Sequence, residues 1–108
     1  MKYIKKYNLF NNINKKINID TDSYYILTDI VHPEIKSVVK CKNIKENSID
    51  VEGYYLDAYK IGNKKGQKIS FVISKLIDKY YKLLSKANKK QIKFYKQREL
   101  EENTNKYN

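Results

Sequence analysis

Between residues 24 and 73 the chain alternates apolar with polar side chains, and turn-forming residues interrupt this pattern at short intervals. A period of two is typical of β-strands, because successive side chains point to opposite faces of a sheet. We therefore expect a small antiparallel sheet of three to four strands. The predicted strands are residues 24–31, 35–44, 49–61 and 67–73, separated by Pro33, by residues 45–48 and by residues 62–66.

The second and third predicted strands match each other as the two arms of a hairpin. If Cys41 pairs with Val51, each of two lysines lies opposite an acidic side chain on the polar face. Such cross-strand pairs contribute about 0.2–1 kcal/mol each and help to fix the register. The two predicted ion pairs are Lys40 with Glu52 and Lys42 with Asp50.

Three glycines mark places where this sheet must turn or bend. Gly53 interrupts the third predicted strand, and we expect a β-bulge there. Gly62 and Gly66 bracket the next turn, where a positive φ favours glycine.

Residues 74–98 have the spacing of one long amphipathic helix, with Ser74 as its N-cap and an apolar side that would cover the sheet. Residues 2–15 also space their apolar side chains every three or four positions, although the many asparagines there are mediocre helix formers. We predict an α+β fold in which residues 1–98 form one domain and 99–108 a polar flexible tail. A winged-helix-like arrangement is the alternative, but it requires three helices before the wing, whereas 24–61 has the pattern of strands.

The predicted C-terminal helix carries lysines along one side and almost no acids. At 100° per residue, seven lysines fall within a sector of roughly 100° opposite the apolar side. Within residues 68–98 Asp78 alone opposes ten cations, and unpaired like charges on a helix are destabilising. This arrangement favours an anionic partner over the alternative of an ordinary solvated helix face. The seven residues are Lys75, Lys79, Lys82, Lys86, Lys89, Lys93 and Lys96.

The overall charge agrees with this interpretation. The formal net charge is +11, and lysine outnumbers arginine 22 to 1. Lys, Asn, Ile and Tyr, whose codons are rich in A and T, make up 59 of the 108 residues. We infer an AT-rich genome, such as that of a low-GC bacterium, its phage or plasmid, a parasite or a large virus. Codon usage accounts for lysine in place of arginine, but not for the excess of cations over acids.

Nucleic acid is the anionic partner that the sequence favours. Lys64 and Lys65 at the tip of the predicted hairpin are further candidates for contact with phosphates, and the N-terminal lysines could form a basic arm. Because arginine is nearly absent, we expect binding to the backbone of DNA or RNA rather than base-specific recognition. The alternative is a small interaction protein, such as a phage- or plasmid-encoded modulator that docks on a host protein or nucleoprotein complex.

Several other functional classes have no support in the sequence. One His and one Cys are too few for a protein-only zinc site, and no Gly-rich nucleotide loop is present, so we expect no metal, cofactor or catalytic residue. No apolar run approaches the length of a membrane span. Cys41 has no second cysteine to pair with, which is typical of a reducing, cytoplasmic location.

Overall fold

The computed structural model describes residues 19–74 and 83–107. Five antiparallel strands form one sheet and a single helix packs on it, so the predicted α+β fold is confirmed, with more strands than expected. The elements are β1 (Tyr24–Thr28), β2 (Lys36–Ile44), β3 (Ser48–Tyr55), β4 (Lys68–Ser74), β5 (Leu84–Lys86) and α3 (Lys89–Tyr107).

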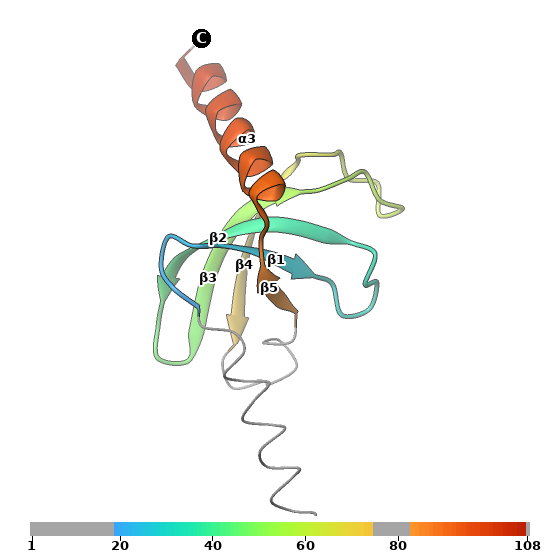
Figure 1. Cartoon of the computed structure of the whole chain (residues 1–108). Coiled ribbons are helices and arrows are strands. Elements are labelled where there is room, and N and C mark those ends of the chain that lie inside the picture. Colours follow the sequence, from blue (N-terminus) through green and yellow to red (C-terminus); the bar gives the residue numbers. More distant parts are fainter. Residues whose placement is uncertain (1–18, 75–82, 108) are drawn as a thin grey trace, which may run out of the picture.

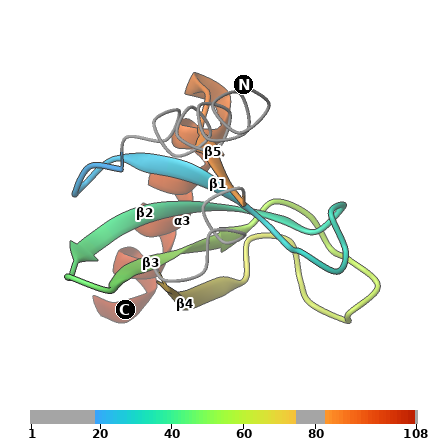
Figure 2. The ribbon, with the colours of Figure 1, turned by 90° about the horizontal axis from the view of Figure 1, so that it is seen from below.

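The strands follow the order β4-β3-β2-β1-β5 across the sheet, as Figure 2 shows. The first four are successive hairpins, and β5 returns to pair with the outer edge of β1. β1 ends at Thr28 rather than at residue 31, because the Asp29 carboxylate accepts the N–H groups of Val31 and His32 in a tight turn. Within residues 19–74 and 83–107 the structure contains no candidate membrane-spanning helix.

The register of the β2–β3 hairpin is the predicted one at its centre. Cys41 lies opposite Val51 and Lys40 lies opposite Glu52. A bulge between Cys41 and Asn43 then shifts the register, so the predicted pairing of Lys42 with Asp50 is wrong. Neither predicted ion pair forms: Lys40 Nζ lies 3.9 Å from Asp22 instead, and the two acids are each 3.2 Å from the Nζ atom of another lysine. These pairs are Lys42 with Glu52 and Lys45 with Asp50.

Gly53 lies in register opposite Val39 and not at a bulge, so that prediction is also wrong. A Cβ atom at this position would stand 1.9 Å from the carbonyl oxygen of Val38. Glycine is therefore needed where the two backbones approach each other closely. The turn glycines behave as predicted, with positive φ values of 87° at Gly62 and 77° at Gly66.

Both faces of the sheet bury apolar side chains, as strand alternation requires when each face is covered. The first face holds the larger cluster and the second face holds the cluster beneath α3. Tyr95, in the cluster beneath α3, is the one fully buried side chain that the helix contributes to either cluster. The larger cluster is Tyr25, Val39, Cys41, Ile49, Val51, Ile73 and Leu84, and the smaller one is Ile26, Val38, Tyr54 and Tyr95.

The prediction of one continuous helix over residues 74–98 is wrong. Ser74 closes β4, and residues 84–86 form β5 instead of a helical turn. Leu84 pairs with Leu27, and the Thr28 N–H donates to the Leu83 carbonyl at 2.9 Å. The open edge of β1 offers hydrogen bonds that local helical periodicity cannot reveal, and tertiary pairing overrides propensity there.

The helix starts later and ends later than predicted. Asn88 and Gln91 form a reciprocal capping box, in which each backbone N–H donates to the other side chain, at 2.8 and 2.9 Å. The helix continues to Tyr107, so most of the predicted tail at 99–108 is helical. The predicted N-terminal helix at 2–15 lies outside the described residues.

We expect Gly53→Ala to lower the free energy of unfolding by at least about 2 kcal/mol, because the new Cβ would overlap the Val38 carbonyl. Gly62→Ala is the matched control: no atom lies within 4 Å, and only the cost of a left-handed φ, about 1 kcal/mol, applies. Urea denaturation of the two variants tests this order. Equal losses would contradict the proposed backbone approach.

Candidate nucleic-acid-binding surface

Helix α3 is held on the second face of the sheet by three aromatic rings. Tyr95, 1% exposed, inserts between Tyr24 of β1 and Tyr54 of β3. Its ring centroid lies 5.1 Å from each neighbour, with interplanar angles of 71° and 65°. These edge-to-face contacts fix how the helix is rotated about its own axis.

A second set of contacts anchors the same helix further along. The Tyr54 hydroxyl donates to the Glu102 carboxylate at 3.0 Å, and Lys68 Nζ lies 3.6 Å from the same oxygen. Burial raises the pKa of the Tyr54 hydroxyl well above its usual range, and the hydrogen bond to Glu102 acts in the same direction. The phenol therefore remains a neutral donor. Arg98 Nε donates to the Gly66 carbonyl at 3.0 Å, which ties the helix to the β3–β4 turn.

These anchors leave the opposite side of α3 facing solvent. Lys89, Lys93 and Lys96 share that side within roughly 60°, over a length of about 10 Å. All three are exposed, and none forms an ion pair with a described residue. Figure 1 shows the helix rising from one side of the sheet, with its far side unobstructed by the strands.

Basic residues from other elements lie along both flanks of the helix. Lys65 Nζ, from the turn before β4, stands 5.9 Å from the centre of the Phe94 ring. On the other flank the ring of Tyr24 has the Nζ atoms of Lys40 and Lys96 at 5.8 and 5.9 Å. We name the "α3 basic surface" as Lys64, Lys65, Lys89, Lys90, Lys93 and Lys96.

The structure redistributes the predicted site residues. Lys86 lies on β5 opposite Tyr25, on the first face of the sheet, so it is separated from the lysines of α3 and the predicted stripe along one helix is wrong. Lys75, Lys79 and Lys82 lie outside the described residues. The hairpin residues Lys64 and Lys65 are exposed, and Lys65 is brought next to α3. Lys90 is absent from the predicted set, although it belongs to the same acid-free run of sequence and could have been predicted from that run.

The net charge of the described chain is concentrated in one stretch. Residues 19–74 contain eight lysines and eight acids, so the first four strands and their loops are balanced. Residues 83–98 contain six cations and no acid. Lys40, Lys42 and Lys68 of the sheet each form an ion pair, whereas Arg98 is the one cation of 83–98 with an ion pair to a described residue.

The lysines at the start of α3 interact unfavourably with the positive end of the helix dipole. The first turn of the helix has no acidic residue, and it begins with Lys89 and Lys90. The helix N-terminus carries a partial positive charge, so a cation there costs about 0.3–1 kcal/mol. This energetic cost would be relieved by an anion bound at the same surface.

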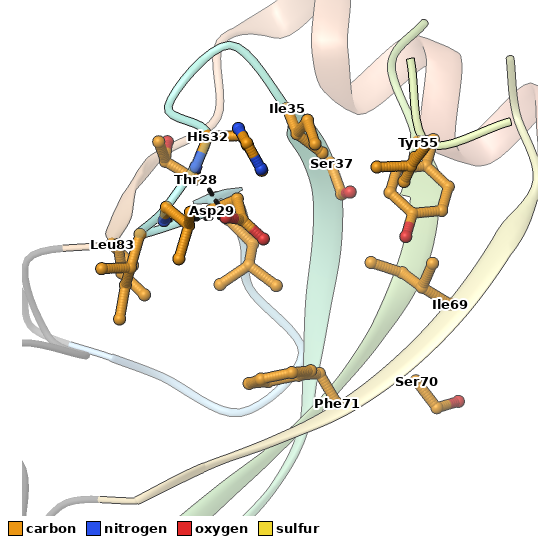
Figure 3. Close-up of a pocket in the computed structure, with 14 residues that line it drawn as sticks. Thr28, Asp29, His32, Ile35, Ser37, Tyr55, Ile69, Ser70, Phe71 and Leu83 are labelled. Atoms are coloured by element: carbon orange, nitrogen blue, oxygen red, sulfur yellow. Dashed lines mark hydrogen bonds between the residues drawn. The ribbon is translucent and has the colours of Figure 1, made fainter. Parts of the chain in front are cut away.

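A separate apolar hollow of about 510 Å³ opens on the first face of the sheet, opposite α3. Figure 3 shows side chains of the β1–β2 connection on one side of it and those of β3 and β4 on the other. His32 lines the hollow, but the fully buried Cys41 does not. No group of three or more His, Cys, Asp or Glu that could hold a metal occurs among the described residues.

Comparison with protein-family models, curated protein sequences and solved structures found no match to this chain. The α3 basic surface and the apolar hollow lie on opposite faces of the sheet.

We expect Tyr95→Ala to lower the free energy of unfolding by about 3–5 kcal/mol, because it removes the ring that packs between Tyr24 and Tyr54. Leu100→Ala on the same helix is the control; Leu100 is 67% exposed, and its loss should cost less than about 0.5 kcal/mol. Urea denaturation monitored by circular dichroism compares them. Similar effects of the two substitutions would mean that α3 is not anchored through Tyr95.

Proposed function

We propose that this protein is a non-enzymatic nucleic-acid-binding protein that contacts the phosphate backbone through the α3 basic surface. One observation carries the proposal: residues 83–98 hold six cations and no acid, while residues 19–74 balance eight lysines against eight acids. Codon usage would enrich lysine everywhere in the chain, so it does not account for this segregation. Release of counterions from phosphates would offset the repulsion among the lysines.

The single arginine supports recognition of the backbone rather than of bases. Arginine is the usual side chain for bidentate contact with guanine. Here the Arg98 guanidinium bonds to the Gly66 carbonyl and to Glu101, and it stacks 5.6 Å from the Tyr54 ring centre. The contacts with Gly66 and Tyr54 hold α3 on the sheet, and the bond to Glu101 lies within the helix. The exposed cations are lysines, which attract phosphates as point charges without selecting a sequence.

The turn before β4 would extend the contact surface sideways from the helix. Gly62 and Gly66 allow the tight turn, and Lys64 and Lys65 are exposed at its tip. The Arg98 bond to Gly66 and the 5.9 Å approach of Lys65 to Phe94 hold this tip beside α3. A backbone lying along Lys89, Lys93 and Lys96 would meet these lysines at the flank.

A protein partner is a second candidate, favoured by the apolar hollow. Its rim exposes large apolar side chains, with Val31 75% and Ile61 54% exposed. Exposed apolar clusters of this kind commonly mark interaction sites. Retention of one specific protein after nuclease treatment and a high-salt wash would favour this candidate over nucleic acid.

The proposed function predicts a steep salt dependence and a local effect of charge reversal. Affinity for a short duplex DNA, a single-stranded DNA and an RNA should fall strongly between about 50 and 200 mM salt, as measured by fluorescence anisotropy. Lys93→Glu should weaken binding about tenfold and reduce the slope of log K against log salt by roughly 0.9, the value of one phosphate contact.

Lys60→Glu is the matched control for that substitution. Both substitutions change the net charge by the same amount. Lys60 is exposed, forms no ion pair with a described residue and lies near His32 and Glu34, in the part of the loop away from α3. Its effect on affinity should be no more than about twofold. A flat salt response, or equal losses in the two variants, would exclude a phosphate-binding role for the α3 basic surface.

A further inference from the structure

Strand β4 has one edge that no described strand covers. It stands at the end of the sheet, opposite β5, as Figure 2 shows. The Tyr55 N–H donates to the Gln67 carbonyl at 3.0 Å, so residue 67 directs its backbone groups toward β3. In an antiparallel pair the direction alternates along the strand. Ile69 and Phe71 therefore bond to β3, while Ser70 and Val72 direct their N–H and C=O groups outward.

The opposite side of β3 gives the same assignment independently. The Leu56 N–H donates to the Lys36 carbonyl at 3.0 Å, so the even-numbered residues of β3 face β2. The odd-numbered residues Val51 and Gly53 therefore face β4, where their partners are Phe71 and Ile69. The backbone groups of Ser70 and Val72 therefore lie on the outer edge of the sheet.

This edge lacks the features by which proteins usually protect an exposed strand. Protected edges carry prolines, bulges or several charges. β4 has no proline, its register with β3 is continuous, and Lys68 at its start is its one charged residue. Phe71 is 45% exposed and Val72 is 63% exposed, so apolar surface flanks the open hydrogen-bonding groups on both faces.

We propose that two copies of this chain pair antiparallel through β4, with a two-fold axis at Phe71. In this register the outward N–H and C=O groups of Ser70 bond to those of Val72 in the second copy. By symmetry, those of Val72 bond to Ser70 of the second copy. On the first face it sets Phe71 beside its own copy and Ile69 beside Ile73 of the second copy. The segment Ile69–Ile73 is thus complementary to itself when its direction is reversed. Aromatic and β-branched cross-strand pairs stabilise such a ladder.

The symmetric register with its axis one residue earlier fits less well. An axis at Ser70 would place Val72 beside Lys68 of the second copy, and Ile73 beside Gln67. The axis at Phe71 keeps the two Lys68 side chains apart, and each is already close to Glu102 of its own chain, at 3.6 Å. This charge arrangement, together with the matched apolar pairs, favours a second copy over an unrelated strand.

The size of the contact predicts a weak dimer. A seven-residue strand is about 23 Å long, and one added strand pair falls at the small end of specific interfaces. Each copy carries a net charge of +11, so salt should strengthen the dimer by screening the repulsion. Nucleic-acid binding has the opposite salt dependence, which keeps the two proposals separable.

Sedimentation velocity of the full chain without nucleic acid tests the proposal. The mass should rise from 12.9 kDa toward twice that value as concentration rises through the micromolar range, and more so at higher salt. Val72→Pro should remain monomeric, because proline removes an outward N–H that β3 does not use. Val72→Ala, which keeps that N–H, should still dimerise. Lys93→Glu should dimerise at least as well as the original chain, because it leaves β4 unchanged and lowers the net charge of each copy.

Two results would overturn the pairing. The first is a monomer at every concentration of the original chain, and the second is a Val72→Pro variant as dimeric as Val72→Ala. Circular dichroism and a urea midpoint establish that each variant is folded. Should Val72→Pro not fold, Phe71→Lys replaces it, because it would set two lysines directly opposite each other across the axis. A dimer that survives Phe71→Lys would contradict the proposal.

Discussion

The packing of Tyr95 between Tyr24 and Tyr54 is the contact on which the rest of the arrangement depends. Each edge-to-face pair contributes about 0.5–1.5 kcal/mol beyond the area it buries. Their larger effect is geometric, because the buried ring sets the rotation of α3 on the sheet. Given that rotation, Lys89, Lys93 and Lys96 must face solvent, and Arg98 and Glu102 must face the sheet.

The same contact separates two electrostatic environments. Beneath the helix, charges are matched: Glu102 receives Tyr54 and Lys68, and Arg98 lies against Glu101 and the Gly66 carbonyl. Above it, lysines stand without described acidic partners. The one arginine thus makes contacts within the protein, and the exposed cations are lysines. For this reason we propose contact with phosphates rather than recognition of bases. A β4-paired dimer would present two such surfaces.

Much of the sheet was predictable because strand alternation and turn chemistry are local signals. The pairing of Cys41 with Val51 and of Lys40 with Glu52 followed from matching apolar and charged positions alone. The bulge after Cys41 was not predictable, since no Gly or Pro marks it. Gly53 looked like a bulge, but its cause is the approach of the Val38 carbonyl, which depends on the neighbouring strand.

Local sequence was sufficient to predict the alternating strands, the turn glycines and the concentration of cations after residue 82, because each depends on neighbours along the chain. Contacts between distant segments are needed to explain why residues 84–86 pair with β1, why the helix begins at Lys89, and why Lys65 lies beside Phe94. Helical periodicity continues through Leu84, so local propensity could not exclude one long helix. The hydrogen bonds offered by the open edge of β1 come from residues more than fifty positions away, and they overrode it.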